Sequence, residues 1–292
     1  GKTYLMDLFY EQLPFRRKMR VHFHRFMQRV HKDLADLQGT KDPLTAVAER
    51  IHDEAVVICF DEFFVTDIAD AMILGGLFEA LFARGVTLVA TSNIVPGRLY
   101  EDGRQRQRFL PAIAMVKQFC RVLNVDSGVD YRLRVLEQAE LYHSPLGEAA
   151  NASLANSFRG ITHGQVVLHA PIDINDRLVE VICRTDDVLM CRFSELCEKP
   201  RSAHDYIEIA REYHSVVLAD VPALGASNDD AARRFINLVD EFYDRSVKLI
   251  IAADRPILAL YSEGRLSFEF QRTQSRLQEM QSRDYLAREH RP

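Results

Sequence analysis

Two apolar runs in the first 100 residues have the pattern of strands that are buried on both faces of a parallel sheet. Residues 55–60 are apolar without a break, and residues 86–90 form a second, largely apolar run. Between them, apolar side chains recur at helical spacing over residues 67–84, and Gly85 follows where a helix often ends on a left-handed glycine. This strand–helix–strand order with short connections predicts an α/β fold with a parallel sheet covered by helices on both faces.

Other elements of the first half continue this alternation. Helices are expected over residues 3–13, 25–37 and 105–118, and strands over residues 19–24 and 120–125. Together with the two apolar runs, they give the order of strands and helices that is typical of a doubly covered parallel sheet.

The second half begins with a different pattern. Residues 146–158 predict a polar helix, and residues 165–193 alternate and are rich in β-branched side chains. With a turn at residues 175–176, this second stretch predicts a small antiparallel β element. A helix is expected from Ser202, a suitable N-cap, to about residue 213.

Residues 216–256 repeat the layout of residues 56–96 over the same length. The first strand leads to Asp220 and the second ends at Asp254, but no Asp-Glu pair follows either strand. We therefore expect this segment to add parallel strands to a core sheet shared by both ends of the chain, and not to carry a ligand site of its own. A short strand over residues 266–270 and a polar terminal helix are expected to follow.

These patterns divide the chain into three predicted segments. Residues 1–134 are expected to form a core of parallel strands and helices, and residues 135–213 a lid-like insertion of helices and antiparallel strands. Residues 214–292 would add the strand–helix–strand unit and the terminal helix, packed on the core.

Composition narrows the class of protein. The 292 residues are 47% apolar and 27% charged, which is typical of a soluble globular protein. The net charge of -5 excludes a uniformly basic nucleic-acid coat, and no apolar run reaches the roughly 20 residues that span a bilayer. Five cysteines without a CxxC pair favour reduced thiols and a cytoplasmic location.

The first residues carry the first sign of chemistry. Gly1-Lys2-Thr3 before a helical pattern matches the second half of a phosphate-binding loop, and we expect the first half to precede Gly1. Lys2 would place a positive charge on the β- and γ-phosphates of ATP, and the Thr3 hydroxyl would bind Mg²⁺. Backbone N–H groups at the start of the helix would bind phosphate oxygens.

Two carboxylates follow the first buried strand. Asp61 and Glu62 would emerge at the carboxyl edge of the sheet, where open α/β sheets bind ligands. We expect Asp61 to hold Mg²⁺ through water and Glu62 to polarise the attacking water. Asn93, at the tip of the neighbouring strand, would contact the γ-phosphate and that water.

A basic stretch offers a further charge. Residues 98–121 contain six Lys or Arg and two acidic residues, with Arg104, Arg106 and Arg108 at alternate positions. One of these arginines could reach the nucleotide of a neighbouring subunit and stabilise the transferring phosphoryl group. A solvated basic turn and a nucleic-acid patch remain alternatives. A metal site at His22 and His24, with His31 further along the chain, is disfavoured. No third ligand lies close to the first two in sequence, and no Cys or carboxylate completes the site.

Several longer strings resemble one known family, the ZapE cell-division ATPases of Gram-negative bacteria and their mitochondrial relatives, the AFG-like ATPases. The strings are VHFHRFM (21–27), CFDEFFVTDIADAMIL (59–74), TSNIVP (91–96), LYEDGRQRQRFLPAI (99–113), VDYRLR (129–134), ARRFINLVDEFYDR (232–245) and FEFQRTQSRLQEMQS (268–282). The resemblance spans nearly the whole chain and is stronger to the bacterial branch.

The resemblance implies an AAA+-related P-loop ATPase that uses ATP and Mg²⁺, with residues 1–134 as its ATPase core. It matches Lys2 and Thr3 to the phosphate loop, Asp61 and Glu62 to the metal-binding and water-activating pair, and Asn93 to the sensor. Arg106 lies in the Gln-Arg element of the family and is the first choice for an arginine finger, with Arg108 second. The candidates for a sensor-2 arginine are Arg233, Arg234, Arg272 and Arg276.

For function, the resemblance implies a homo-oligomer, such as a hexamer, that remodels FtsZ at the division ring. It further implies cytoplasmic location with recruitment to the division site or to a membrane surface. Three alternatives stay open: a nucleic-acid loader or initiator ATPase, a quality-control ATPase acting on membrane-complex subunits, and a small-molecule kinase. Stable nucleic-acid binding is not expected, and a site built to handle water disfavours the kinase.

Overall fold

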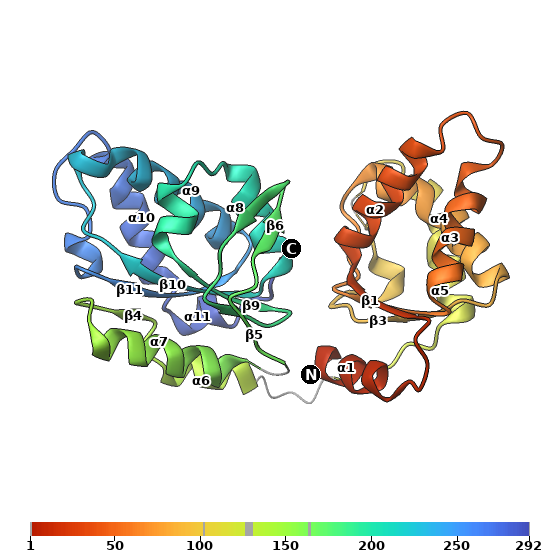
Figure 1. Cartoon of the computed structure of the whole chain (residues 1–292), viewed down its shortest axis with the longest axis horizontal. Coiled ribbons are helices and arrows are strands. Elements are labelled where there is room, and N and C mark those ends of the chain that lie inside the picture. The colour runs from red at the N-terminus through yellow and green to blue at the C-terminus, as the bar shows by residue number, and fades with distance from the viewer. Residues whose placement is uncertain (1, 102, 126–130, 163–164, 292) are drawn as a thin grey trace. The chain divides into compact units, whose positions relative to one another are not determined.

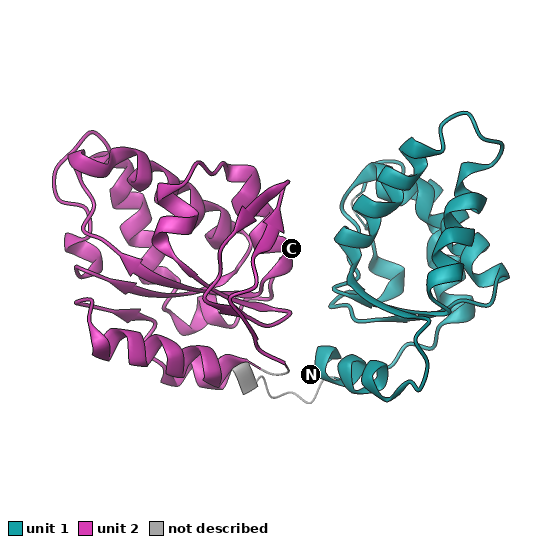
Figure 2. Cartoon of the chain, in the orientation of Figure 1, with its two compact units in different colours: residues 1–127 teal, residues 128–292 magenta. Residues whose placement is uncertain are grey.

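The computed structural model describes residues 2–101, 103–125, 131–162 and 165–291. The chain forms two compact units, residues 1–127 and residues 128–292 (Figure 2). Each unit has its own sheet and its own apolar cores, so the two are considered separately. No helix among the described residues has the length and apolar character needed to cross a membrane.

The first unit contains a sheet of three parallel strands in the order β1–β2–β3 (Figure 1). The strands are β1 (Lys18–His22), β2 (Val57–Asp61) and β3 (Thr87–Ala90). The helices are α1 (Lys2–Gln12), α2 (Phe23–Asp36), α3 (Pro43–Glu54), α4 (Ile68–Ala83) and α5 (Arg106–Phe119), with a short 3₁₀ turn η1 (Pro96–Arg98).

Helices cover both faces of this first sheet. Ile58 and Phe60 of β2 point into a large core formed with α2, α3, α4 and α5. Val57 and Cys59 point to the other face, where they pack with Met6 of α1. Successive side chains of a strand point to opposite faces, so a strand buried on both faces must be apolar throughout. The apolar run before Asp61 is this strand.

The second unit contains a six-stranded sheet in the order β4–β11–β10–β9–β8–β5 and a separate hairpin, β6–β7. The strands are β4 (Tyr142–His143), β5 (Val167–Leu168), β6 (Ile172–Ile174), β7 (Arg177–Val179), β8 (Cys183–Arg184), β9 (Val188–Arg192), β10 (Ser215–Val221) and β11 (Lys248–Ala253). β4, β11, β10 and β9 are parallel, whereas β8 and β5 are antiparallel to their neighbours.

Two groups of helices cover this second sheet. The helices of the unit are α6 (Tyr131–Gln138), α7 (Glu148–Ile161), α8 (Ala203–Glu212), α9 (Asp229–Asp244), α10 (Ser267–Glu279) and α11 (Arg283–Leu286), with short turns η2 (Ser194–Glu198), η3 (Ala226–Asn228) and η4 (Ile257–Ala259). Val216 and Leu218 of β10 pack with α8, α9 and α10, and Val217 and Ala219 pack on the opposite face with α6 and α7. Figure 1 shows the two groups of helices on opposite sides of the sheet.

Most predicted elements are confirmed, and so is the α/β class with parallel strands covered by helices on both faces. Gly85 ends α4 with φ 75°, as expected of a left-handed glycine. Ser202 caps α8 through a capping box with Asp205. The antiparallel pairing predicted in residues 165–193 is present, with the turn of the β6–β7 hairpin at residues 175–176.

Two predicted strands are wrong. Residues 120–125 follow α5 without joining a sheet, and Val122 and Leu123 are exposed, so this stretch has no partner strand and buries no face among the described residues. Residues 267–270 begin α10. Leu266 and Phe270 are buried one helical turn apart, whereas Phe268 is 83% exposed. The alternation of Leu266, Phe268 and Phe270 therefore imitated a strand.

The expectation of one sheet shared by both ends of the chain is also wrong for the described strands. β10 and β11 pair with β9 and β4 of their own unit, and β1, β2 and β3 form a separate sheet. The segment over residues 165–193 thus contributes β9 to the same sheet as the strand–helix–strand repeat. The predicted segment boundaries at residues 134 and 213 stay predictions, beside the observed division after residue 127.

Candidate nucleotide site

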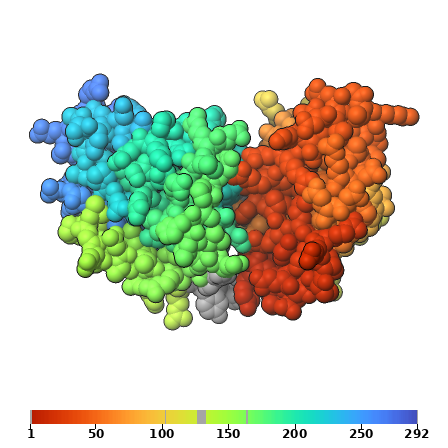
Figure 3. All heavy atoms as spheres, in the orientation of Figure 1, coloured from red at the N-terminus to blue at the C-terminus, as the bar shows by residue number. Residues whose placement is uncertain are grey.

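The candidate site lies at the carboxyl ends of β2 and β3, beside the start of α1. Helix α1 lies at the surface of its unit (red in Figure 3) and packs on the sheet through Met6, which places Thr3 near the end of β2. β2 is buried over its whole length and ends at Asp61, which is 3% exposed. The polar side chains that follow the two strands therefore gather at one edge of the sheet.

Asp61 is the centre of this group. Its Oδ1 accepts hydrogen bonds from the Thr91 hydroxyl at 2.6 Å and from the Thr3 hydroxyl at 3.4 Å. Its Oδ2 accepts from Nη2 of Arg20 at 3.3 Å. A buried carboxylate is stabilised by charged and hydrogen-bonding partners of this kind.

Lys2 and Asn93 meet beside Asp61. Nζ of Lys2 donates to Oδ1 of Asn93 at 2.5 Å, which joins the start of α1 to the loop that follows β3. The structure thus brings together four residues that the sequence predicted for one site, Lys2, Thr3, Asp61 and Asn93. Gly1, the fifth residue predicted to bind nucleotide, lies outside the described residues.

Glu62 follows Asp61 in a left-handed backbone conformation with φ 51°. Its N–H donates to the Thr91 hydroxyl at 3.1 Å, and the next N–H, of Phe63, donates to the Thr91 carbonyl at 2.7 Å. A left-handed conformation costs a non-glycine residue about 1–3 kcal/mol and is common at functional sites. The Thr91 hydroxyl therefore fixes both the Asp61 side chain and the Glu62 backbone.

The two finger candidates lie at the start of α5. Nη2 of Arg106 donates to the carbonyl oxygen of Gly97 at 2.7 Å, so Arg106 ties α5 to the loop after Asn93. Arg108 is exposed and donates to Oε1 of Gln105 at 3.3 Å. None of the contacts recorded among the described residues joins either arginine to Asp61 or Lys2.

The sensor-2 candidates all lie in the second unit. Arg272 and Arg276 both bind Asp240, and Arg276 also lies over the ring of Tyr243. Arg233 pairs with Glu269 at 3.8 Å. Arg234 donates to the carbonyl oxygen of Cys197 at 2.8 Å. These contacts give each arginine a role within its own unit and leave the sensor-2 assignment a prediction.

Sequence reasoning missed Arg20 and Thr91. In β1, Met19 and Val21 pack into the core on the side of α2, so Arg20 points to the opposite face, beside α1. The alternation along this short strand was the available signal for Arg20. Thr91 lies two residues before Asn93, the residue that the sequence predicted for this strand end. No sequence signature shows that the Thr91 hydroxyl binds both Asp61 and Glu62.

The oxygen atoms of Thr3 and Asp61 fit a magnesium ion. Mg²⁺ prefers hard oxygen ligands and usually takes one or two from the protein and the rest from phosphates and water. A hydroxyl and a carboxylate 3.4 Å apart, beside a lysine, match this requirement. Burial raises the pKa of the nearby Cys59 thiol to about 11, and Mg²⁺ prefers oxygen over sulfur ligands, so Cys59 does not compete with Thr3 and Asp61.

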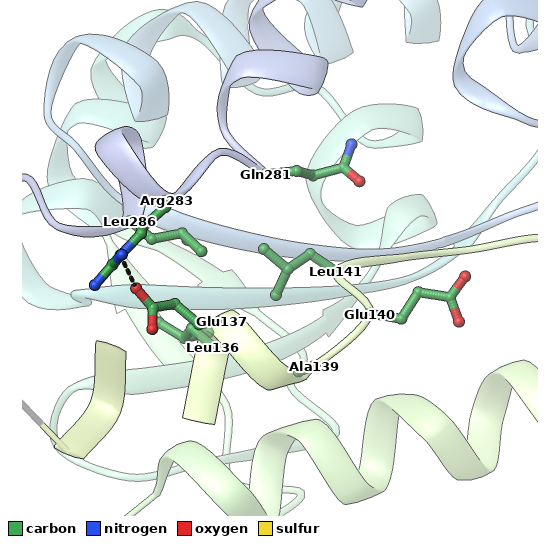
Figure 4. A pocket seen from close by; sticks show the side chains of 8 residues that line it. All are labelled: Leu136, Glu137, Ala139, Glu140, Leu141, Gln281, Arg283 and Leu286. Carbon is green, nitrogen blue, oxygen red and sulfur yellow. Dashed lines mark ion pairs between the residues drawn. The ribbon is translucent and has the colours of Figure 1, made fainter. Parts of the chain in front are cut away.

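A separate pocket lies in the second unit (Figure 4). It is open and is bordered by the ion pair of Arg283 with Glu137, 2.7 Å apart, and by the apolar side chains of Leu136, Leu141 and Leu286. None of the residues predicted for the nucleotide site lines it.

Comparison of the sequence with known proteins places this chain in a family. The sequence model of the AFG1-like ATPases matches residues 1–289. The chain is 54% identical over 290 residues to the cell division protein ZapE of Escherichia coli strain K12, covering 99% of this chain and 77% of that protein. It is 38% identical over 331 residues to lactation elevated protein 1 homolog B of Danio rerio, covering 98% of this chain and 66% of that protein.

No solved structure matches the chain significantly. The family resemblance drawn from the sequence strings is confirmed by the match over residues 1–289. The chain belongs to the AFG1-like ATPase family and is an ATPase.

Proposed function

We propose that ATP binds at the cluster of Lys2, Thr3, Asp61 and Asn93, and that Glu62 activates the water that attacks its γ-phosphate. The contacts of Asp61 carry this proposal. One buried carboxylate is bonded to Thr3 of α1 and to Thr91 after β3, with the pair of Lys2 and Asn93 alongside. These contacts join α1 to the ends of β2 and β3, and phosphoryl transfer to water depends on such positioning of the groups around the phosphates.

Each side chain has a distinct role in this site. The Lys2 ammonium binds phosphate oxygens, and Asn93 holds that ammonium near the strand ends. Thr3 and Asp61 hold Mg²⁺, which when bound neutralises charge that develops on the phosphates. Glu62 accepts a hydrogen bond from the attacking water and orients it, while its backbone is fixed by Thr91.

A substitution at Glu62 tests this assignment. Glu62→Gln keeps the size of the side chain but removes its negative charge, so nucleotide binding should persist while turnover falls about 10²–10⁴-fold. Binding is measured with a fluorescent ATP analogue and turnover by phosphate release. Glu79→Gln on the exposed side of α4 is the matched control. Undiminished turnover in Glu62→Gln would overturn the role of Glu62.

We further propose that an arginine of α5 acts on the nucleotide of a neighbouring copy in a homo-oligomer such as a hexamer. Arg106 remains the first choice, and the exposed Arg108 the second. Arg106→Ala and Arg108→Ala are compared for turnover, each alone and each mixed with Lys2→Ala. Because each mixture contains intact arginines and intact sites on different copies, partial recovery of turnover identifies the finger. Full activity of both single variants excludes both residues.

The name of the Escherichia coli relative suggests the process. We propose that this ATPase acts in cell division in the cytoplasm, that it is recruited to the division site, and that it remodels FtsZ. Co-sedimentation with FtsZ filaments, with and without ATP, tests the partner. Binding that changes with ATP in the wild type but not in Lys2→Ala supports it. Absence of co-sedimentation in either condition removes FtsZ as the partner and leaves the ATPase assignment unchanged.

A further inference from the structure

Arg20 lies between two carboxylates of the first unit. Its Nε lies 2.7 Å from Oδ1 of Asp7 in α1, and its Nη2 donates to Oδ2 of Asp61 at 3.3 Å. The side chains of Arg20 and Asp61 are 17% and 4% exposed, so solvent screens this contact only weakly. The Arg20 guanidinium therefore connects α1 with the carboxylate at the end of β2.

Strand register places Arg20 at this point. Arg20 lies opposite Cys59, two residues before Asp61 on the neighbouring parallel strand. Cys59 packs toward α1, and Arg20 lies on the same face of the sheet, where it meets Asp7. Its long side chain then reaches from the middle of β1 to the end of β2.

The two oxygens of the Asp61 carboxylate have different partners. Oδ1 faces the hydroxyls of Thr3 and Thr91, whereas Oδ2 is bonded to Arg20. A carboxylate with both oxygens bonded cannot rotate without breaking one of these bonds. Oδ1 is thus held toward Thr3, the other oxygen proposed to bind Mg²⁺.

We propose that Arg20 is a positioning residue of the nucleotide site. It fixes the orientation of Asp61 and, through Asp7, the distance from α1 to β2. Arginine suits this task because its planar fork presents several N–H donors and can bind two carboxylates at once, which the single ammonium of lysine does poorly. The inference rests on the proposed nucleotide site and adds a residue that touches neither nucleotide nor metal.

Arg20→Lys tests the geometry, because it keeps the positive charge. Outer partners of metal ligands typically contribute about 10–100-fold to metal affinity or activity, and we expect a change of this size in the Mg²⁺ concentration that gives half-maximal turnover. Affinity for a fluorescent ATP analogue in EDTA should stay within about twofold, since Lys2 and the phosphate-binding backbone are unchanged. Binding of Mn²⁺ to the nucleotide-bound protein, followed by electron paramagnetic resonance, should weaken in parallel.

Two further variants separate positioning from folding. Asp7→Asn leaves the bond of Arg20 to Asp61 but loosens the other end of the guanidinium, so it should shift metal dependence in the same direction by less. Arg16→Lys, at an exposed position before β1, should change neither readout. Thermal unfolding of each variant without ligand measures any loss of stability.

The possible outcomes distinguish this inference from the proposed function. A wild type that hydrolyses ATP, with Arg20→Lys of equal metal dependence, overturns the role of Arg20 alone. A loss in Arg20→Lys that lies entirely in metal-free nucleotide affinity or in unfolding temperature also overturns it. A wild type that binds no nucleotide removes the proposed site and this inference with it.

Discussion

The segments β2–α4–β3 and β10–α9–β11 have the same order, the same parallel strands and a 16-residue helix each. Their strand ends differ. Asp61 ends β2 with its side chain 4% exposed and bonded to Thr91, Thr3 and Arg20. Asp220, near the end of β10, has its side chain 48% exposed and binds Arg192, itself 60% exposed. Exposed ion pairs contribute only about 0–1 kcal/mol.

The buried charge of the second segment lies at the opposite end of its strand. Lys248 begins β11 and is 1% exposed, and its Nζ donates to the carbonyl oxygens of Ser246, Tyr285 and Arg288 at 2.9, 3.2 and 2.8 Å. These carbonyls belong to the turn before β11 and to α11 and the residues after it. Lys248 thus joins these segments, away from the strand ends where parallel sheets bind ligands.

This difference shows what converts a strand end into a site. Both segments have an acidic residue at or near the end of their first, buried strand. In the first segment, three other elements also place polar side chains around it: α1 supplies Thr3, β1 supplies Arg20 and the residue after β3 supplies Thr91. The neighbours, more than the strand itself, distinguish the two segments.

The largest expected effect contrasts the two acidic residues directly. Asp61→Asn removes a charge that the metal and its partners require, so ATP turnover should fall about 10²–10³-fold. Asp220→Asn removes half of an exposed ion pair and should leave turnover unchanged. Steady-state phosphate release compares them under one condition. A comparable loss of turnover in Asp220→Asn would show that the second segment takes part in catalysis. The functional difference drawn between the two strand ends would then be wrong.

The first segment was largely predictable because its signals are local. Uninterrupted apolar residues before Asp61, helical spacing up to Gly85 and a second apolar run suffice to place β2, α4 and β3. Parallel strands carry their carboxyl ends to one edge, so the meeting of Lys2, Thr3, Asp61 and Asn93 also followed.

What sequence reasoning missed depends on partners distant in the chain. The role of Arg20 requires the register of β1 on β2, and that of Thr91 requires two bonds to one hydroxyl. The strand expected at residues 120–125 failed because it has no partner among the described strands. Leu266 and Phe270 can share one face of a strand or one face of a helix, and only the exposure of Phe268 decides for the helix. Helix α3 is also not among the elements predicted from the sequence, although Asp42, its N-cap, is a local signal for the start of a helix.

Lys248→Met should give the next largest effect, on stability. The variant leaves three carbonyl groups without their ammonium partner, two of them in buried residues, and we expect the free energy of unfolding to fall by about 2–3 kcal/mol. Urea unfolding measures the change. The control is Lys199→Met, which removes an exposed lysine that pairs with Glu195. Unchanged stability would mean that the buried charge of the second segment is dispensable.

Thr91→Val should produce a smaller effect on both stability and activity. Valine keeps the branched shape but removes the hydroxyl that donates to Asp61 and accepts from the Glu62 N–H. We expect the free energy of unfolding to fall by about 1–2 kcal/mol and turnover to fall about tenfold. Thr91→Ser, which retains the hydroxyl, should recover most of the turnover. Equal activity of the valine and serine variants would show that the hydroxyl does not position the Asp61 side chain and the Glu62 backbone for turnover.

The smallest expected effect concerns the start of the helix in each segment. In α9, Asp229 accepts hydrogen bonds from the Tyr261 hydroxyl at 2.7 Å and from Nε of Arg265 at 3.2 Å. The Tyr261 bond is the main cause that holds the pKa of Asp229 below its ordinary value of 3.8. In α4, Asp67 instead caps the helix by accepting the N–H groups of Ala69 and Asp70.

Because the folded pKa of Asp229 is depressed, its contribution to stability is present above the unfolded pKa of about 3.8–3.9 and is lost as pH falls through the folded pKa. Tyr261→Phe removes the main cause of the depression, so the variant should lose less stability than the wild type on acidification. Urea unfolding at pH 6 and pH 3 should therefore show a gap between the two proteins that narrows at pH 3. A gap that stays constant would mean that Tyr261 stabilises α9 by packing alone, with no contribution from its hydrogen bond to Asp229.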